Sequence, residues 1–285
     1  MRLKCYAKLN LSLDVTGKLP NGYHTLESVM QTISLHDTLE INPDDSNTIT
    51  VHCEKVDGEN IVEKAAKLFF EETKIQNKGL KIAINKEIPM AAGLGGGSSN
   101  AAAVICALDK IYGTNLSEDT LCEMALKIGA DVPFFIKGGT AIVKGIGEEL
   151  SPISNLPDCK ILLVKADTKP STKEMYEKID NLDKPYHPNT NLVAKGIKNG
   201  SLDEAVKEMG NSFETAWDKT SVPKIKSVLK SFNVLYAGLS GSGPTVFGVF
   251  PKETDLSECM NALEKFDCFK SIATPTKCGF EIVEE

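Results

Sequence analysis

The stretch PMAAGLGGGSSNAAA, residues 89–103, sets four glycines within five positions directly before an alanine-rich segment. Glycine tolerates positive φ and leaves backbone N–H groups uncovered by side chains. A helix that starts here adds unpaired N–H groups and the positive end of its dipole. These features favour a loop that binds an anion such as phosphate, although a flexible loop before a capped helix also explains the glycines.

Two familiar phosphate-binding motifs do not fit this loop. A Walker A loop needs lysine after its last glycine, whereas Gly97 is followed by Ser98. The dinucleotide-binding pattern Gly-x-Gly-x-x-Gly, read from Gly93, needs glycine at position 98. Ser98 or Ser99 is expected to cap a helix that continues over residues 100–112.

Working outward, the chain mixes strand-like and helix-like segments. Apolar residues alternate with polar ones over residues 9–15, so Lys8 and Asn10 share the polar face of a predicted strand. A second glycine-rich loop, residues 239–245, lies between two apolar runs. The pattern indicates an α+β fold.

The remaining elements follow from periodicity and from helix caps. Further strands are expected at 25–41, 48–53, 79–84, 140–144, 160–164, on both sides of the 239–245 loop, and at 278–283. Helices are expected at 61–69, 117–128, 202–209, 222–232, 256–266, and after the capping box that starts at Ser171. The Pro/Ser/Asn-rich loop 151–157 predicts a boundary between an N-terminal domain, 1–155, and a C-terminal domain, 156–275. We expect residues 276–285 to return to the first domain's sheet.

Composition excludes several classes of protein. The 285 residues are 41% hydrophobic and carry a net charge of −7. No run approaches the roughly 20 apolar residues of a membrane span, and the scattered basic residues give no nucleic-acid footprint. The first residues lack a secretory signal, so we expect a cytoplasmic protein that binds neither nucleic acid nor membrane.

Cysteine and histidine give no sign of a metal site. The eight cysteines are widely spaced without a Cys-x-x-Cys pair, and we interpret them as reduced thiols. The four histidines show no i, i+4 pair, which leaves a zinc site with little support.

The glycine-rich stretch resembles the phosphate loop of the GHMP small-molecule kinases. Five other segments resemble motifs of that family in the expected order: 7–11 (AKLNL), 22–25 (GYHT), 129–134 (GADVPF), 170–172 (PST) and 239–245 (LSGSGPT). The match covers nearly the whole chain and is therefore more specific than a glycine cluster. It implies a two-domain GHMP kinase architecture with ATP and the acceptor in the cleft between the domains.

The resemblance assigns catalysis to two residues. Asp131 would be the base that accepts the proton of the acceptor hydroxyl, and the alternative is a cap for the short helix that follows. Lys8 would keep Asp131 ionised and offset negative charge in the transition state, and the alternative is a solvated strand lysine. We favour the catalytic role for both.

The resemblance also implies an ATP site with Mg²⁺. The phosphates would contact backbone N–H groups of the loop, which comprises Pro89, Met90, Ala91, Ala92, Gly93, Leu94, Gly95, Gly96, Gly97, Ser98 and Ser99. Ser98 or Ser99 would lie near the magnesium, and the sequence leaves the metal ligands unknown. Asn60 and Lys86 are assigned to an adenine pocket, with a helix cap at Asn60 and a surface lysine at Lys86 as comparable alternatives.

The implied acceptor is a small molecule, cytidine diphosphate-linked methylerythritol, phosphorylated on its 2-hydroxyl in non-mevalonate isoprenoid precursor biosynthesis. Tyr23 and Tyr176 would stack on the cytosine, His24 would hydrogen-bond its edge, and Asn10 would bind the erythritol hydroxyls. Half-burial explains a tyrosine equally well, and helix packing would account for Tyr176.

Two other functions stay open. A related kinase for mevalonate, homoserine or a sugar would keep the loop but not a cytosine pocket, and residues 22–25 argue against it. A ligand sensor of this fold without catalysis is disfavoured by the presence of both Lys8 and Asp131. The protein is expected to be a monomer or a homodimer.

Overall fold

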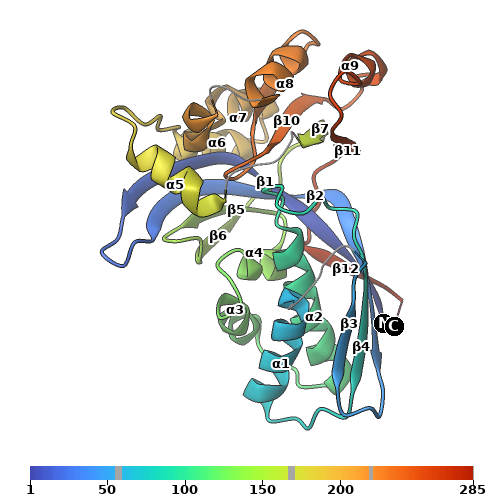
Figure 1. The fold of residues 1–285 in the computed structure, drawn as a ribbon. Coiled ribbons are helices and arrows are strands. Elements are labelled where there is room, and N and C mark those ends of the chain that lie inside the picture. Colours follow the sequence, from blue (N-terminus) through green and yellow to red (C-terminus); the bar gives the residue numbers. More distant parts are fainter. Residues whose placement is uncertain (55–59, 166–170, 218–220, 285) are drawn as a thin grey trace.

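The computed structural model describes residues 1–54, 60–165, 171–217 and 221–284, which form two β-sheets with helices packed against them (Figure 1). The larger sheet runs in the order β12-β1-β2-β4-β3; β8 pairs with β1, β5 pairs with β2, and β6 pairs with β5. It contains β1 (Arg2–Lys18), β2 (His24–Pro43), β3 (Ile49–His52), β4 (Leu80–Asn85), β5 (Thr140–Lys144), β6 (Glu149–Ile153), β8 (Gly210–Asn211) and β12 (Phe280–Glu284).

The hairpin of β1 and β2 runs through both halves of the molecule (Figure 1). The two strands pair antiparallel from Arg2↔Glu40 to Lys18↔His24, with register shifts along the way. One shift falls between Asn10 and Ser12, where a β-bulge changes the local twist. The predicted strand at the start of the chain is therefore confirmed as part of a longer one.

Four helices cover one face of the larger sheet (Figure 1). They are α1 (Ile61–Thr73), α2 (Gly96–Tyr112), α3 (Glu118–Leu126) and α4 (Val132–Lys137). The alanines at positions 101–103 of α2 are fully buried, because their small side chains let the helix lie close to the sheet. Phe69, Phe134 and Phe135 fill the remaining space in this core.

The smaller sheet belongs to the C-terminal half. Its order is β11-β7-β10-β9, with β7 (Cys159–Lys165), β9 (Tyr236–Leu239), β10 (Thr245–Pro251) and β11 (Phe269–Ala273), all antiparallel. The accompanying helices are α5 (Thr172–Asp180), α6 (Thr190–Lys198), α7 (Leu202–Glu208), the 3-10 turn η1 (Ser212–Ala216), α8 (Ser221–Lys230) and α9 (Ser257–Ala262). The helices in the described ranges are too short or too polar to span a membrane.

A shared core joins the two halves. Ala7, Leu9 and Leu11 of β1 pack in one cluster with residues of the C-terminal half that include Ile161 and Phe247. All five side chains are fully buried. The strand that carries Lys8 and Asn10 therefore packs between the two halves, which places those side chains at the junction.

The end of the chain returns to the first sheet. β12 pairs antiparallel with the beginning of β1, and the N–H of Tyr6 donates to the carbonyl oxygen of Gly279 at 2.9 Å. The hydroxyl of Ser99 donates to the same carbonyl at 3.3 Å. Gly279 is thereby tied to both β1 and α2.

Three sequence expectations are corrected. Neither Ser98 nor Ser99 caps α2, because the helix starts earlier and its N-cap is Gly95 in the left-handed region. The expected loop 151–157 is partly strand, since β6 extends to Ile153; Pro152 is tolerated because β6 is an edge strand paired only with β5. Helix α6 was not expected from the sequence.

Candidate active site

The glycine loop connects β4 to α2 and packs against β1. Gly95 has φ 71°, a conformation that glycine adopts without strain. A Cβ atom at this position would lie 2.7 Å from Cζ of Phe135 and 2.9 Å from Cγ of Lys8. The loop therefore needs glycine both for its backbone turn and for its close approach to the lysine strand.

A cavity of about 360 Å³ opens over this loop. Residues 89–98 line it, together with Asn60, Lys86 and Asn100. The first turn of the 17-residue helix α2 supplies N–H groups without intrahelical partners and the positive end of the helix dipole. This cavity fits a polyphosphate at one end, as the anion-loop interpretation predicts.

Lys86 is not a surface residue, so that alternative is wrong. Its side chain is 8% exposed and pairs with Asp37, which is fully buried. The other carboxylate oxygen of Asp37 accepts hydrogen bonds from the N–H groups of Glu87 at 2.9 Å and Ile88 at 2.8 Å. Asp37, which sequence reasoning missed, thus anchors both Lys86 and the chain that enters the glycine loop.

Asn60 is a helix cap, as the alternative interpretation expects, and it also faces the cavity. It is the N-cap of α1, where its side-chain oxygen accepts a hydrogen bond from the N–H of Val62 at 3.0 Å. Helix capping explains the residue type, and an adenine contact stays a prediction.

The two serines at the start of α2 face different surroundings. Ser98 lines the cavity, whereas Ser99 is fully buried and donates its hydroxyl to Gly279. Asn100, which follows them, also lines the cavity, and its buried amide oxygen has no hydrogen-bond partner among the described residues. The structure thus brings Ser98 and Asn100 to the cavity but not the side chain of Ser99.

Lys8 and Asp131 meet beside the loop. The distance from Nζ of Lys8 to Oδ2 of Asp131 is 3.6 Å, and the side chains are 5% and 37% exposed. Lys8 is therefore not the solvated strand lysine of the alternative interpretation. Asp131 occupies the N-cap position of α4, but its side chain makes no capping hydrogen bond, so the cap alternative is wrong as well. The carboxylate faces Lys8, and its role as a base stays a prediction.

Asn10 lies behind Lys8. Its amide oxygen accepts a hydrogen bond from Nζ of Lys8 at 2.6 Å, and its amide nitrogen donates to Ser28 at 2.8 Å. The residue is 1% exposed. Its predicted contact with acceptor hydroxyls stays a prediction, while its present contacts hold the lysine in place.

The second glycine loop closes the junction from the C-terminal half. The hydroxyl of Ser240 donates to the carbonyl oxygen of Gly93 at 3.0 Å and accepts from the N–H of Asn10 at 3.4 Å. The hydroxyl groups of Thr172, from the 170–172 motif, and Ser242, from the second glycine loop, lie 3.3 Å apart. Pro170, which starts the 170–172 motif, lies outside the described residues. Ser240 therefore connects the first glycine loop with the strand of Lys8.

A second cavity, of about 700 Å³, contains the predicted aromatic residues. Tyr23, His24 and Tyr176 line it, and Tyr23 is 61% exposed. The ring of His24 stacks on Tyr176 with centroids 4.3 Å apart and planes 14° apart. Tyr176 also packs edge-on against Phe213, which explains its burial.

The charge of Asp131 acts on a residue of this aromatic cavity. Burial raises the pKa of Tyr176 to about 12, and the nearby charge of Asp131 adds to the shift. Asp180 accepts hydrogen bonds from Lys18 at 2.6 Å and from Nε2 of His24 at 2.8 Å, and these bonds lower the pKa of its carboxyl group. Asp180, which the sequence did not indicate, therefore orients the His24 ring.

Protein ligands for a metal are sparse. Within the described part of the chain, no group of three or more His, Cys, Asp or Glu side chains could hold a metal ion. Magnesium in nucleotide sites commonly keeps several waters and binds substrate phosphates, with only one or two protein ligands. The Ser98 hydroxyl at the cavity is compatible with that mode of binding.

The arrangement brings a glycine loop at a helix N-terminus, a buried lysine and a carboxylate close together. A carboxylate that can take a hydroxyl proton, next to a cation that can offset phosphate charge, suits phosphoryl transfer. The aromatic cavity offers flat surfaces for a heterocycle. These are the parts of a small-molecule kinase.

Known proteins resemble this chain over nearly all of its length. The family models described as GHMP kinases N terminal domain and GHMP kinases C terminal match residues 60–139 and 193–267. The 4-diphosphocytidyl-2-C-methyl-D-erythritol kinase of Clostridium tetani is 41% identical over 272 residues, which cover 93% of this chain and 96% of that protein. Its namesake in Caldicellulosiruptor saccharolyticus is 38% identical over 287 residues, with coverage of 99% and 98%. A crystal structure of 4-(cytidine 5'-diphospho)-2C-methyl-D-erythritol kinase is similar with a TM-score of 0.83 at 28% identity, covering 96% of this chain and 99% of that one.

Proposed function

The chain belongs to the GHMP kinase family, and from this we propose that it transfers the γ-phosphoryl group of ATP to the 2-hydroxyl of 4-diphosphocytidyl-2-C-methyl-D-erythritol. The step belongs to non-mevalonate isoprenoid precursor biosynthesis. The observation that carries the proposal is the Lys8–Asp131 pair. Lys8 adjoins Gly95 of the glycine-loop cavity, and Asp131 lies close enough to Tyr176 of the aromatic cavity to contribute to its raised pKa.

ATP binds in the glycine-loop cavity in this proposal. The polyphosphate lies against the N–H groups at the start of α2, and the adenosine extends toward Asn60 and Lys86. Bound Mg²⁺ neutralises part of the phosphate charge. Ser98 is the residue we expect beside it, because the side chain of Ser99 is directed to Gly279.

The transfer itself needs a proton acceptor and a cation. Asp131 takes the proton of the acceptor hydroxyl while the hydroxyl oxygen of the acceptor forms the new bond to the γ-phosphorus. The bond between the γ-phosphorus and the β,γ-bridging oxygen breaks, and that oxygen leaves with ADP. Lys8, whose Nζ lies 3.6 Å from Oδ2 of Asp131, stabilises the negative charge on the transferring group. The glycine loop holds the phosphate in line, which is the larger part of catalysis in this type of reaction.

The acceptor's cytosine binds in the aromatic cavity. We infer that it stacks on Tyr23 and beside Tyr176, whose ring is stacked on His24, while its diphosphate and methylerythritol reach toward Lys8. The hydrogen bond from His24 to the cytosine edge stays a prediction, and Nε2 of His24 is already bonded to Asp180. Mevalonate, homoserine and a simple sugar lack a flat ring and would leave this cavity unfilled. The proposal extends to a cytoplasmic location and to a monomer or homodimer.

The test is ADP release with ATP and Mg²⁺ for three acceptors: the cytidyl diphosphate compound, mevalonate and homoserine. We expect turnover with the first only, and a decrease of about 10²- to 10⁴-fold in Asp131→Asn. Asp119→Asn, an exposed aspartate on α3, is the control and should retain full activity.

Two outcomes would overturn the proposal. Preferred turnover of mevalonate or homoserine would assign a different acceptor. ATP binding without turnover of any acceptor would favour the sensor function instead.

A further inference from the structure

A buried serine stands behind the lysine at the candidate active site. Ser28 of β2 is fully buried and contacts neither cavity. Its hydroxyl oxygen lies 2.8 Å from the amide nitrogen of Asn10, whose amide oxygen lies 2.6 Å from Nζ of Lys8. Ser28 is therefore two hydrogen bonds away from the reacting groups without being able to touch a substrate.

The direction of these hydrogen bonds follows from a count of protons. A serine hydroxyl has one proton to donate, and that of Ser28 goes to the carbonyl oxygen of Ser12 at 2.6 Å. Toward Asn10 it can then act only as an acceptor, so the amide nitrogen of Asn10 must face it. The amide oxygen of Asn10 must consequently face Lys8.

The opposite orientation of the Asn10 amide would be unfavourable for Lys8. It would turn an NH₂ group toward the ammonium group, so two donors would meet without an acceptor. Lys8 is 4% exposed, and little water is available to replace the lost partner. Its ammonium would then move relative to Asp131, which is 3.6 Å away.

We propose that Ser28 is a positioning residue for phosphoryl transfer, which fixes the Asn10 amide so that the Lys8 ammonium is held beside Asp131. The inference rests on the proposed function, because it needs a reaction in which Lys8 acts. It extends the active site to a residue of β2 that lies outside the glycine loops and the two cavities.

A purely structural role for Ser28 is the alternative to exclude. The hydrogen bond from Ser28 to the carbonyl oxygen of Ser12 lies at the β-bulge between β1 and β2. Loss of that bond alone could lower stability without affecting the rate. The experiment must therefore separate the bond to Asn10 from general damage to the hairpin.

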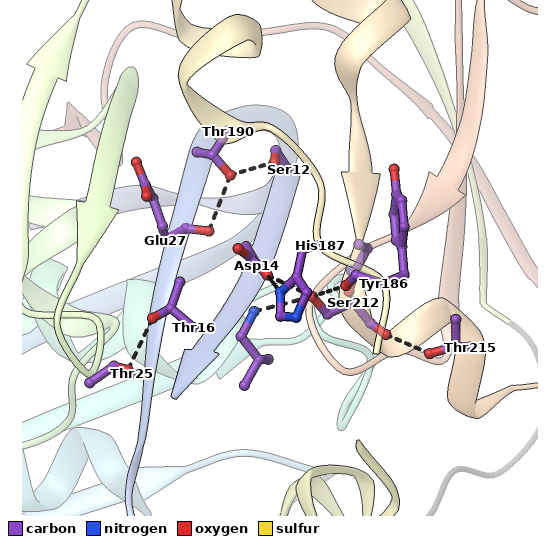
Figure 2. A network of polar contacts seen from close by, with 12 residues as sticks. Ser12, Asp14, Thr16, Thr25, Glu27, Tyr186, His187, Thr190, Ser212 and Thr215 are labelled. Carbon is purple, nitrogen blue, oxygen red and sulfur yellow. Dashed lines mark hydrogen bonds and ion pairs between the residues drawn. The ribbon is translucent and has the colours of Figure 1, made fainter. Parts of the chain in front are cut away.

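Ser12 provides a matched control. It is also a fully buried serine of the same hairpin, but its hydroxyl bonds that of Thr190 at 2.7 Å (Figure 2). The hydrogen bonds of the Asn10 side chain go to Lys8 and Ser28 instead. Ser12→Ala keeps the backbone carbonyl that Ser28 needs. The two alanine variants each lose one buried hydroxyl, and only Ser28→Ala releases the Asn10 amide.

The experiment measures kcat, the KM for ATP and the midpoint of urea unfolding for the full chain. We expect Ser28→Ala to lower kcat about 10- to 100-fold with the KM for ATP changed less than about threefold, because the lysine is misplaced while the glycine loop is intact. Ser28→Thr, which keeps the hydroxyl, should restore kcat to within about threefold. Ser12→Ala should keep kcat within about twofold, since the lysine stays in place.

A double-mutant cycle gives a second readout. If Ser28 acts through Asn10, then Ser28→Ala should change kcat less than about twofold in an Asn10→Ala background. The inference is overturned if Ser28→Ala retains wild-type kcat, if Ser12→Ala loses as much activity, or if the two effects multiply. Should Ser28→Ala fail to fold, the Thr variant decides: a folded Ser28→Thr with kcat lowered tenfold or more would also overturn it. Wild-type protein without turnover would instead contradict the proposed function.

Discussion

The two cavities of this molecule differ in whether backbone or side chains form most of their walls. Backbone forms the glycine-loop cavity, where Gly95 and the first turn of α2 present N–H groups and the walls are tightly packed. Side chains form the aromatic cavity, where Tyr23 is mostly exposed and Asp180 holds His24 through hydrogen bonds in contact with water. The shape of the glycine-loop cavity depends on close packing around its backbone. The aromatic cavity depends on separate side-chain contacts, and a single substitution can remove one of them without the others.

This difference suggests different responses to mutation. A change at a crowded backbone position should disturb a whole ligand site, because neighbouring atoms have no room to adjust. A change in an exposed side-chain wall should remove only the contact that side chain makes. The following predictions test that contrast.

The largest effect is expected at Gly95. Gly95→Ala would place a Cβ into Phe135 and Lys8 at a left-handed backbone position, so the loop must shift. We expect the KM for ATP to rise about 100-fold, with a lower free energy of unfolding. Steady-state kinetics at saturating acceptor would measure the first effect and urea unfolding the second.

Gly113 is the matched control for Gly95. It lies at the other end of α2 with φ 62°, and a Cβ there would meet nothing within 4 Å. Gly113→Ala should cost about 1–2 kcal/mol in stability and leave the KM for ATP unchanged. An equal rise in the KM for ATP in Gly95→Ala and Gly113→Ala would contradict this prediction. It would mean that the left-handed backbone strain common to both positions, and not the crowding at Gly95, causes the effect on ATP.

A smaller effect is expected at Tyr23. Removing one stacking aromatic costs about 1–3 kcal/mol for a nucleic-acid base, so Tyr23→Ala should raise the KM for the acceptor about tenfold. The KM for ATP should not change. Tyr186→Ala, which removes another exposed tyrosine outside this cavity, is the control. An unchanged KM for the acceptor in Tyr23→Ala would show that the cytosine binds elsewhere.

The smallest effect is expected from the ion pairs around His24. Hydrogen bonds from Lys18 and His24 lower the pKa of Asp180 from its ordinary value of 3.8, so the folded state favours the carboxylate. The stability from this preference is complete above that ordinary value and disappears as the pH falls through the lowered pKa. Asp180→Asn should therefore be less stable than wild type at pH 7, and the difference should shrink between about pH 5 and pH 3.

Asp158 offers a comparison for that titration. Lys252 lowers its pKa in the same direction, but the Asp158 side chain is 79% exposed. Urea unfolding of Asp158→Asn should show a smaller difference from wild type at pH 7, because solvent screens an exposed pair. A pH-independent difference for Asp180→Asn would mean that its carboxylate charge contributes nothing to stability.

The sequence predicted the glycine-loop cavity better than the aromatic one for a physical reason. Consecutive glycines tolerate positive φ and leave N–H groups uncovered, so residues 89–97 favoured an anion loop, with a flexible loop as the alternative until the other motifs were considered. The exact start of α2 was missed, because Gly95 replaces a side-chain cap with a left-handed backbone turn. For Asp131 the residue type fits both a cap and a base, and only the geometry separates them.

The supporting residues could not be predicted from local patterns. Asp37, Ser28 and Ser240 act on partners that are 49, 18 and 147 positions away along the chain. Each is an ordinary polar residue in its own segment, and only the pairing of β1, β2 and the two glycine loops gives it a role. Such residues require knowledge of which strands pair and in which register, and a local sequence pattern does not show distant partners.

The return of the chain at Gly279 has a consequence for biosynthesis. Ser99 and its partner Gly279 are 180 residues apart, and β12 covers the edge of β1 only after both have been made. Cys5 of β1 and its partner Phe280 of β12 are about 275 positions apart. At a synthesis rate of roughly 5–20 residues per second, that edge of β1 stays unpaired for about 15–55 s. During this interval the emerging polypeptide is a substrate for chaperones and a template for intermolecular strand pairing, so translation speed, as well as amino-acid sequence, influences how much active protein a cell obtains.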